Sequence, residues 1–392
     1  MISKKMHILI IPSEHFITQT QPLGGIFQYH QAKALNSAGY KIGVLSVGYI
    51  TPRYLTCKYI YRKEEKIDNI NIKRDYKQLY FPHRYMPFKI LKNNYIKMAD
   101  KLYSEYIKEF GMPDIIHAHN FLYAGVVAEF LKNKYGIKYI VTEHSSSFAR
   151  NNLSHEKIKS IEDVAKNASK VTAVSSSFNN ILKEYTKTKI DLLSNIVDDF
   201  FFQKEFQNKI SNDFIFLHIA SLDKNKNQEL LIRSFEKIAK LNDKIYLNIA
   251  GDGYMKKSLE ALVQQLDIEK QVNFLGRISQ EKVRDEMMKS NCFVLSSNFE
   301  TFGVVLIEAL ACGLPLIATK CGGPEDIVNE QNGILINVEN QLQLEDAMMT
   351  MYKTASKYDK QKLRSYAKDR FGEKAFIKNA MKYYEVGINN GK

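Results

Sequence analysis

Several residue types and patterns are absent or scarce, and each absence narrows the class of protein. The 392 residues contain no tryptophan and only four cysteines, which are Cys57, Cys292, Cys312 and Cys321. The cysteines form no CxxC pair and have no histidine at zinc-binding spacing, which argues against a disulfide framework or a structural metal. We expect these thiols to be buried apolar side chains.

Long apolar runs and a dinucleotide fingerprint are also missing. No stretch approaches the roughly 20 apolar residues that a membrane-spanning helix needs. The apolar run at 7–12 follows basic residues but is too short for a signal core, and it is typical of a first strand. We therefore expect a cytoplasmic protein. No GxGxxG opens a helix, which disfavours a nicotinamide oxidoreductase.

The net charge of +13 is unevenly distributed. Between Thr51 and Lys97 there are twelve basic and four acidic residues, interleaved with tyrosine and phenylalanine. This mix suits an anionic membrane surface or a polyprenyl-diphosphate acceptor, so residues 51–108 are a candidate for peripheral contact with the inner face of the cytoplasmic membrane. No nucleic-acid-binding module is recognised, and nucleic acid is not expected as a partner.

The end of this segment predicts a helix with one apolar stripe, and the stripe has two interpretations. It consists of Leu91, Tyr95, Met98, Leu102 and Tyr106, with lysines among the other positions. Such a helix fits a membrane surface, and it fits equally well a core helix whose lysine face is solvated.

Strand and helix signals alternate along both halves of the chain. This alternation predicts an α/β protein with two Rossmann-like, doubly wound domains, each a parallel sheet with helices on both faces. A stretch of mixed polarity, 195–211, is interpreted as the connection. We expect one domain over residues 1–200, a second over 201–372, and a helix over 373–392 that packs back on the first domain. Ligand crevices of such domains lie at strand carboxyl ends, so the active site is expected in a cleft between them.

The most informative stretch follows the predicted buried strand 292–295. Glu300 falls just beyond that strand, and Glu308 lies eight positions later inside an apolar helix that begins near Gly303. Both carboxylates then border one pocket, together with the free backbone N–H groups of the helix start. Two acids beside an anion-binding helix end favour a ligand with both hydroxyls and phosphates. A nucleotide sugar fits that description.

The E-x7-E pattern of Glu300 and Glu308, with its surroundings, resembles the retaining glycosyltransferases of family 4, which have the GT-B fold. The resemblance covers nearly the whole chain. It implies that Glu300 contacts the donor sugar and that Glu308 holds the ribose hydroxyls. The helix start at Phe302, Gly303 and Val304 would then bind the diphosphate.

Further residues of the second half match this family by position. Lys226 stands where the family has a lysine that stabilises the leaving diphosphate, while Ser221 stands where it has an arginine. The turn at Gly251 corresponds to one near the nucleotide base. No DxD occurs in the sequence, so a metal-bridged diphosphate is not indicated and no metal or other cofactor is expected.

In the first half, Gly24 and Gly25 lie between the first strand and the first helix, where backbone can approach a phosphate or a sugar. The resemblance implies that His119 lies near the anomeric region of the donor. It also implies that Glu143 and His144 belong to an acceptor-side loop. For His117 we expect a core histidine.

These features together predict a retaining, metal-independent hexosyltransferase. It would move a hexose or N-acetylhexosamine from a UDP- or GDP-linked donor to a glycan acceptor, lipid-linked, in cell-surface polysaccharide biosynthesis. The first domain would hold the acceptor and the second the donor. Two alternatives stay open. Ser221 in place of the arginine suits a catalytically silent GT-B subunit that binds nucleotide or a partner transferase, and a nucleotide-sugar epimerase has the same fold.

Overall fold

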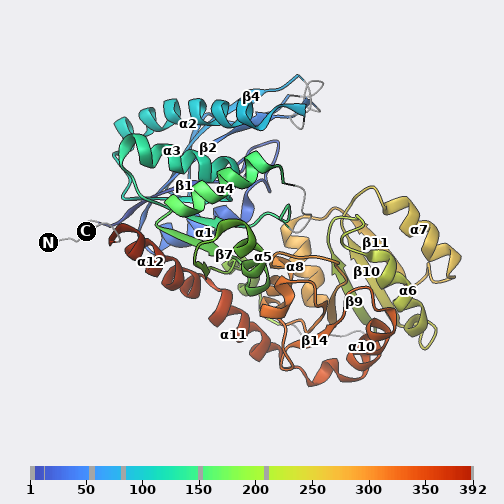
Figure 1. Cartoon of the computed structure of the whole chain (residues 1–392). Helices are drawn as coiled ribbons and strands as arrows, with labels where there is room; N and C mark the ends of the chain where they lie inside the picture. Colours follow the sequence, from blue (N-terminus) through green and yellow to red (C-terminus); the bar gives the residue numbers. More distant parts are fainter. Residues whose placement is uncertain are drawn as a thin grey trace. The chain divides into compact units, whose positions relative to one another are not determined.

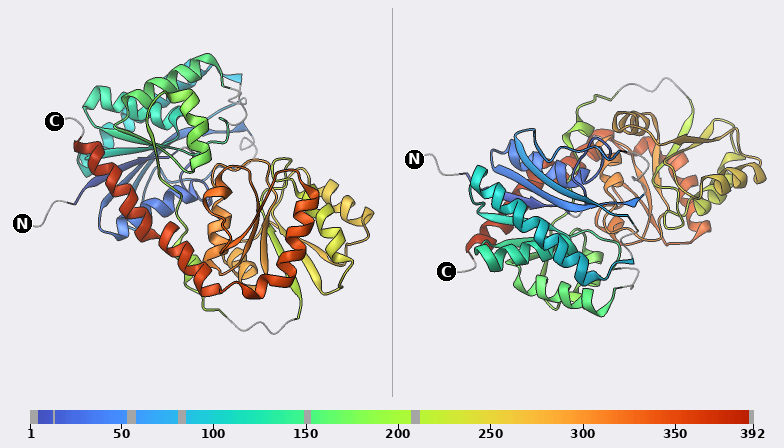
Figure 2. Two further views of the ribbon diagram at one scale, coloured as in Figure 1. Left: turned by 60° about the horizontal axis from the view of Figure 1, so that its bottom comes forward. Right: turned by 90° about the horizontal axis from the view of Figure 1, so that it is seen from above.

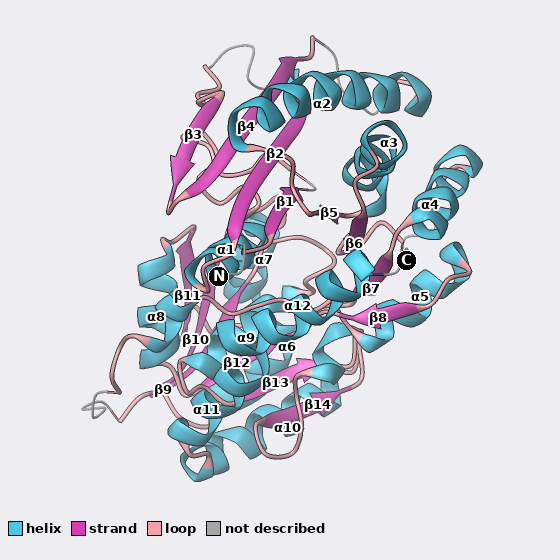
Figure 3. Ribbon diagram, turned by 90° about the vertical axis from the view of Figure 1, so that its left-hand side faces the viewer, coloured by secondary structure: helices cyan, strands magenta, loops and turns pink. Residues whose placement is uncertain are grey.

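The computed structural model describes residues 5–12, 14–52, 58–80, 85–148, 153–206 and 212–389. The chain divides into two compact units. The first comprises 1–174, 178–196 and 376–392, and the second comprises 175–177 and 197–375. Each unit contains one β-sheet with helices packed against it (Figures 1 and 3). The two α/β domains expected from the sequence are therefore present.

The first unit is built on an eight-stranded sheet in the order β3-β4-β2-β1-β5-β6-β7-β8. All neighbouring strands run parallel except β3 and β4. The strands are β1 (His7–Ile11), β2 (Lys41–Ile50), β3 (Glu64–Ile67), β4 (Ile70–Gln78), β5 (Ile115–His119), β6 (Tyr139–Glu143), β7 (Lys170–Ala173) and β8 (Ile190–Leu192).

The helices that accompany this sheet are α1 (Ile26–Ser37), α2 (Phe88–Phe110), α3 (Val126–Tyr135), α4 (His155–Asn167), α5 (Ser176–Thr186) and α12 (Glu373–Asn389). One core cluster joins α1 and α12 to apolar residues of β1, β2, β4, β5 and β6. Figure 2 shows α12, in red, running alongside the sheet. The last helix of the chain is thus part of the first unit.

The apolar stripe of α2 lies inside the unit. Leu91, Met98, Leu102 and Tyr106 are buried, while Tyr95 is partly exposed. The helix packs against β2, β4 and α3. Four of the five stripe residues therefore belong to the protein's own core, which fits the interpretation of α2 as a core helix with a solvated lysine face.

The apolar pattern over residues 121–134 predicts one helix, and this prediction is wrong at its start. Residues Phe121–Gly125 form a π-type turn in which Leu122 and Tyr123 have non-helical backbone angles, and α3 begins only at Val126. The apolar pattern continues through the turn, so periodicity alone does not reveal the break.

The basic segment contains a β-hairpin that the sequence analysis did not assign. Asp68 and Asn69 join β3 to β4, and both have positive φ, 46° and 64°, as a two-residue type I′ turn requires. Lys73 and Arg74 of β4 are buried because carboxylates reach them, Glu64 and Glu109 at Lys73 and Glu65 at Arg74. Part of the segment, 53–57 and 81–84, lies outside the described residues.

The second unit has a six-stranded, all-parallel sheet in the order β11-β10-β9-β12-β13-β14. The strands are β9 (Phe214–Ile219), β10 (Ile245–Ala250), β11 (Val272–Gly276), β12 (Cys292–Leu295), β13 (Leu316–Thr319) and β14 (Gly333–Ile336). The helices are α6 (Gln228–Ala239), α7 (Lys256–Gln265), α8 (Gln280–Lys289), α9 (Val304–Ala311), α10 (Gln341–Thr354) and α11 (Lys360–Phe371).

The core of the second unit joins the sheet to α6, α7 and α10 through a single apolar cluster. Cys292, Cys312 and Cys321 are free and buried, as expected, and Cys57 lies outside the described residues. Within the described ranges no helix is long and apolar enough to cross a membrane. The predicted connection at 195–211 is described only up to residue 206.

Candidate active site

An ion pair lies at the carboxyl edge of the second unit's sheet. The Lys226 ammonium is 2.6 Å from a carboxylate oxygen of Glu300, and the Ser297 hydroxyl donates to the same oxygen at 2.7 Å. The side chains of Lys226 and Glu300 keep 22% and 14% exposure. A cation and a hydrogen-bond acceptor are thus held together at the strand ends, where α/β sheets bind ligands.

Side-chain amides join the loops that carry this pair. The Asn225 amide donates to the Phe299 carbonyl at 3.0 Å, and the Asn298 backbone amide donates to the Asn225 carbonyl at 2.7 Å. The Asn227 amide donates to the Asn298 side chain at 3.0 Å. These bonds fix the loop before α6 against the loop after β12, so Lys226 and Glu300 are positioned by the backbone rather than by their own flexible stems.

Helix α9 begins at the same edge, directly after Gly303. Gly303 has φ 95°, a left-handed conformation that glycine adopts without the steric penalty of a side chain. Val304 and Glu308 are four positions apart and share one helix face, and both remain partly exposed, whereas Leu306, Ile307 and the residues after Glu308 are buried. The free N–H groups of this helix start carry the positive end of the helix dipole.

Glu308 has an unusual acidity. Burial raises its pKa to about 7, and the nearby charge of Asp198 adds to the shift. A carboxyl group with such a pKa changes protonation near neutral pH. It can accept hydrogen bonds from ligand hydroxyls in its charged form and donate one when protonated.

Ser221 does not place a cation in this site. Its hydroxyl donates to the Asp223 carboxylate at 2.6 Å, and the other oxygen of Asp223 accepts the backbone amides of Asn225 and Lys226. Ser221 therefore helps to shape the loop that carries Lys226.

Gly251 follows β10 and lies against the end of β9. It has φ 136°, and a Cβ added there would stand 1.8 Å from the Ala220 carbonyl oxygen. Only glycine permits this approach of two strand ends. The turn predicted to lie near the nucleotide base is therefore a tightly packed backbone crossing.

In the first unit, the loop that carries Gly24 and Gly25 is fixed from a neighbouring strand. The buried guanidinium of Arg74 on β4 donates to the carbonyls of Phe16 and Ile17 at 3.0 and 2.7 Å. The Ile17 amide donates to the Gly24 carbonyl at 2.8 Å, and Gly25 is the N-cap of α1. The glycine pair thus lies at the carboxyl edge of β1, held by the buried arginine.

Three histidines lie side by side at the same edge, of which His117 and His119 are buried and His144 is partly exposed. The rings of His117 and His119 on β5 are stacked with centroids 4.3 Å apart, and His119 Nδ1 lies 2.9 Å from His144 Nε2. Burial lowers the pKa of His117 and of His144 to about 3 each, and it lowers that of His119 well below the ordinary value. All three rings are neutral at neutral pH.

The three histidines differ in whether both of their ring nitrogens have a hydrogen-bond partner. Both nitrogens of His117 have hydrogen-bond partners, the Tyr384 hydroxyl at 2.8 Å and the Thr142 hydroxyl at 2.7 Å, as expected for a core histidine. His119 Nε2 and His144 Nδ1 are buried and lack a partner within the described residues. His119 therefore retains one nitrogen for another group.

Glu143, predicted on the acceptor side, has its carboxylate occupied by backbone amides. The side chain is buried, and its carboxylate accepts the backbone amides of Phe121, His144 and Ser145 at 2.7, 2.9 and 2.7 Å. Burial raises its pKa to about 7. The structure gives Glu143 the role of holding the turn after β5 to the loop after β6.

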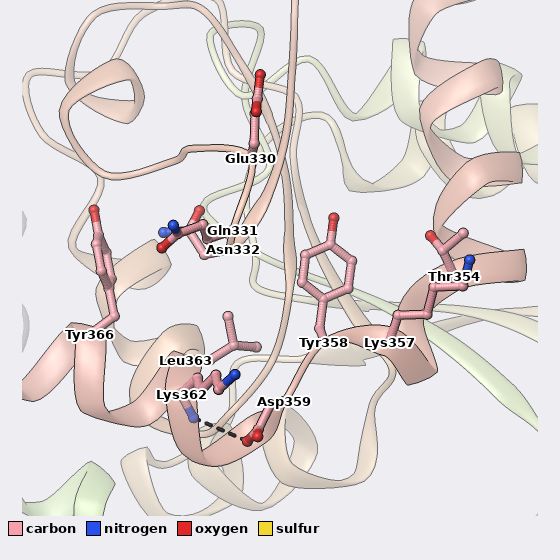
Figure 4. A pocket seen from close by; sticks show the side chains of 10 residues that line it. All are labelled: Glu330, Gln331, Asn332, Thr354, Lys357, Tyr358, Asp359, Lys362, Leu363 and Tyr366. Carbon is pink, nitrogen blue, oxygen red and sulfur yellow. Dashed lines mark hydrogen bonds between the residues drawn. The ribbon is translucent and has the colours of Figure 1, made fainter.

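A well-formed cavity of the second unit lies elsewhere. It has a volume of about 590 Å³ and is drawn in Figure 4. Its lining includes Glu330, Gln331 and Asn332, which directly precede β14, so it opens at the amino end of the sheet, away from Glu300. Parallel sheets bind ligands at the other end, so we assign the candidate site to the Lys226–Glu300 edge. In the described part of the chain, no cluster of three or more His, Cys, Asp or Glu could hold a metal.

Some residues of the site were missed by the sequence analysis. Ser297 and Asn225 hold the ion pair in place, and Gln228 donates to the Ser221 carbonyl at 2.8 Å. Polar residues next to a strand end are too common to be singled out from sequence. The only feature of the sequence that points to these residues is that they lie close to Lys226 and Asn298 along the chain.

Two family models match this chain. Residues 25–199 match the family described as Glycosyltransferase Family 4, and residues 199–370 match Glycosyl transferases group 1. The two models meet at the boundary between the units and together cover most of the chain. The chain belongs to the glycosyltransferases with the GT-B fold.

Two curated relatives illustrate the likeness in sequence. N-acetyl-alpha-D-glucosaminyl L-malate synthase of Bacillus anthracis is 31% identical over 259 residues, 61% of this chain and 65% of that protein. The N-acetylgalactosamine-N,N'-diacetylbacillosaminyl-diphospho-undecaprenol 4-alpha-N-acetylgalactosaminyltransferase of Campylobacter jejuni is 32% identical over 200 residues, 50% of this chain and 53% of that protein. The matches span less than two thirds of these relatives.

Solved structures show the same fold over nearly the full length. Sucrose-phosphate synthase from Thermosynechococcus elongatus superposes with a TM-score of 0.78 at 19% identity, covering 99% of this chain and 100% of that one. Anabaena HepE in complex with UDP and glucose gives a TM-score of 0.71 at 18% identity, with coverage of 97% and 99%. At such identities the likeness establishes the fold alone.

Proposed function

We propose that this glycosyltransferase is retaining and metal-independent, and that it transfers a hexose or N-acetylhexosamine from a UDP- or GDP-linked donor to a lipid-linked glycan. The observation that carries the proposal is the Lys226–Glu300 pair of 2.6 Å at the strand ends beside the start of α9. A sugar diphosphate has both complementary groups: its phosphate oxygens accept hydrogen bonds from an ammonium, and its sugar hydroxyls donate to a carboxylate.

The leaving group determines what the site must stabilise. As the glycosidic bond breaks, negative charge grows on the β-phosphate, and Lys226 together with the N–H groups at Gly303 and Val304 would stabilise it. Glu300 would hold the hydroxyls of the donor sugar and Glu308 those of the ribose. In the retaining reaction we propose, the departing phosphate accepts the proton of the acceptor hydroxyl on the same face, so no separate carboxylate base is assigned.

The first unit would contribute Gly24, Gly25 and His119 near the donor sugar. His119 Nε2 is a buried nitrogen with no partner in the described residues, which suits a hydrogen bond to a sugar hydroxyl. His144 contacts His119 rather than standing alone, so we place it behind His119. For Glu143 we propose a supporting role only, because three backbone amides occupy its carboxylate.

The donor and acceptor classes rest on relatives. HepE was solved with UDP and glucose, and the name of the Campylobacter jejuni relative specifies a diphospho-undecaprenol-linked acceptor. The basic, aromatic segment before α2 is consistent with an acceptor of that kind and with peripheral contact with a membrane. These observations support the proposal for this chain without fixing the sugar.

The test is release of free nucleoside diphosphate from UDP-, GDP- and ADP-sugars, with and without bacterial lipid extract. We expect one donor to be turned over, lipid to increase the rate, and Lys226→Ala and Glu300→Ala to lower it by about 10²- to 10³-fold. Lys224→Ala, a neighbouring lysine in the same loop, is the matched control and should retain most activity. If Lys224→Ala lost activity while Lys226→Ala and Glu300→Ala kept it, the assignment of the active site to Lys226 and Glu300 would be wrong.

A second candidate is a catalytically silent subunit, and one observation favours it. Ser221 donates to Asp223, and no arginine stands at that position to share the phosphate charge with Lys226. Tight nucleotide binding without release of diphosphate, across all donors and acceptors, would support this alternative. Interconversion of free nucleotide sugars without an acceptor would instead indicate an epimerase.

A further inference from the structure

Three tyrosines gather at the carboxyl edge of the first unit's sheet. Tyr49 lies near the end of β2, Tyr95 on α2 and Tyr123 in the turn after β5. The rings of Tyr95 and Tyr123 are stacked with centroids 4.5 Å apart and planes 25° apart. The ring of Tyr49 meets that of Tyr95 edge-on at 5.5 Å. Segments that are distant in sequence thus build one aromatic wall.

Tyr123 is held in a strained conformation. Its φ of 63° and ψ of −69° lie where a residue with a side chain is rarely found, and the preceding Asn120 also has a positive φ of 76°. Such strain persists where the surroundings impose it, and it occurs preferentially at ligand sites. Here it directs Tyr123 toward Tyr95 and Phe88, whose ring centroid lies 5.9 Å away.

Two phenol groups of this wall, those of Tyr95 and Tyr123, are open to a ligand, whereas the Tyr49 hydroxyl is buried behind them. Tyr95 and Tyr123 are partly exposed, and their hydroxyls make no hydrogen bond within the described ranges. Burial raises the pKa of Tyr95 and of Tyr123, and the neighbouring phenol of Tyr49 adds to both shifts. All three phenols therefore stay protonated. The hydroxyls of Tyr95 and Tyr123 can donate to a ligand and accept from it, while Tyr49 supports the ring of Tyr95 from behind.

A sugar ring matches this combination better than a lipid chain does. The C–H faces of a pyranose pack on aromatic rings, and its hydroxyls pair with phenols. A polyprenyl chain would cover the same rings but leave the phenol oxygens without partners, which is unfavourable in a dry contact. A wall made of phenylalanine would suit a lipid, whereas this wall is made of tyrosine.

We propose that Tyr49, Tyr95 and Tyr123 form the subsite for a pyranose ring of the acceptor glycan. The site stands four residues beyond His119 on the turn that follows β5, at the sheet edge where α/β proteins bind ligands. The assignment of this sugar as the acceptor rests on the proposed function, while the affinity for a pyranose does not.

Saturation-transfer NMR on the full chain tests the subsite directly. The probes are the methyl α- and β-glycosides of glucose, galactose, N-acetylglucosamine and N-acetylgalactosamine, with farnesyl phosphate as the isoprenoid probe. Tyr95→Phe and Tyr123→Phe keep both rings and remove single hydroxyls. Tyr80→Phe, at a tyrosine 78% exposed and outside the wall, is the matched control.

We expect at least one pyranoside to bind the wild type, and its affinity to fall about three- to ten-fold in each of the two variants and to stay unchanged in Tyr80→Phe. UDP and GDP affinity should be the same in all four proteins. Pyranoside binding that is absent in the wild type, or equal in all variants, would overturn the subsite. Saturable binding of farnesyl phosphate without binding of any pyranoside would also overturn the subsite.

The outcome separates the subsite from the transferase assignment. Pyranoside binding that depends on Tyr95 and Tyr123, in a protein that turns over no nucleotide sugar, would sustain the subsite and contradict the proposed function. Turnover with an acceptor KM that is unchanged in Tyr95→Phe and Tyr123→Phe would support the proposed function and contradict the subsite. An acceptor KM raised about three- to ten-fold with the donor KM unchanged would support both.

Discussion

His119 and His144 share one hydrogen bond between their rings, with His119 Nδ1 2.9 Å from His144 Nε2. Both rings are neutral because burial lowers their pKa values. A bond between two neutral imidazoles needs one donor and one acceptor, so the proton position on His144 determines which nitrogen of His119 carries hydrogen. His144 thus controls whether His119 Nε2 accepts or donates.

The first prediction concerns His144→Phe. The new ring still packs on Phe27, 4.8 Å from the present His144 ring, but leaves His119 Nδ1 without its partner. An unsatisfied buried group should lower the free energy of unfolding by about 1–3 kcal/mol and also lower kcat. Urea unfolding measures the first effect. His155→Phe, at an exposed histidine, is the control, and an equal loss there would contradict the assignment.

The second prediction is a loss of stability in acid. Burial lowers the pKa to about 3 for His117 and His144 and to about 4 for His218, whereas the unfolded chain has the ordinary 6.5. Below pH 6.5 the unfolded state therefore binds protons that the folded state excludes. Each histidine should remove up to about 1.4 kcal/mol per pH unit as pH falls toward these values. Glu143 and Glu308, whose pKa is raised to about 7, take up protons in the folded state over the same range and offset part of this loss, so we expect a smaller net decrease. Unfolding measured between pH 7 and 5 checks this, and constant stability would refute it.

The E-x7-E region illustrates what the sequence could predict. A buried strand before Glu300 and an apolar helix after Gly303 follow from residue pattern, and both are present. The 2.6 Å contact between Glu300 and Lys226 could not be predicted, because the two residues are 74 positions apart and meet only through the order of strands β9 and β12. Long-range pairing of this kind is a property of topology.

The third prediction concerns Glu308, whose pKa of about 7 follows mainly from burial. Its carboxylate form is the better acceptor for ribose hydroxyls, so UDP or GDP affinity should increase as pH rises from 6 to 8. In Glu308→Gln the side chain does not titrate. Any remaining pH dependence of the affinity then comes from other groups, such as the phosphates of the nucleotide. Calorimetry at pH 6, 7 and 8 should therefore show a steeper rise in the wild type than in the variant, and parallel curves would exclude the role.

A fourth prediction compares two glycines with positive φ. A Cβ at Gly251 would clash with the Ala220 carbonyl at 1.8 Å, whereas a Cβ at Gly276 would meet nothing within 4 Å. Gly276→Ala should cost about 1–2 kcal/mol from backbone strain alone, and Gly251→Ala clearly more. Thermal unfolding of both variants measures the difference. Equal losses would mean that the strand ends relax around the new methyl group.

The fifth prediction concerns the last helix. The Thr172 hydroxyl donates to the Val141 carbonyl, so Thr142 donates to Thr172 and His117 Nε2 donates to Thr142. His117 Nδ1 must then accept from the Tyr384 hydroxyl.

Tyr384→Phe leaves His117 Nδ1 without a donor in a buried position. We expect a loss of about 1–3 kcal/mol in the free energy of unfolding. Tyr383→Phe is the matched control on the same helix. Its hydroxyl donates to the Leu192 carbonyl in an exposed setting where water replaces it, so the loss should be below about 1 kcal/mol. A larger loss for Tyr383→Phe would overturn the order of the relay.

Two elements show why other parts of the fold were not predicted. The strand β4 contains Lys73 and Arg74 and looks solvated in the sequence, yet both are buried because carboxylates from β3 and α2 pair with them. The helix expected from residue 121 fails at Tyr123, where tertiary contacts impose a backbone that local preference opposes. In each case packing outweighs the local pattern, and no local signal records it.

The placement of α12 in the first unit affects the order of events during synthesis. Apart from residues 175–177, the second unit is one continuous stretch, 197–375, whereas the first needs residues from both ends of the chain. Phe376, Ala380, Met381 and Tyr384 fill the first unit's core, so that unit stays incomplete until these residues have been synthesised. The later half of the chain can therefore finish folding before the earlier half, the reverse of the usual N-to-C order.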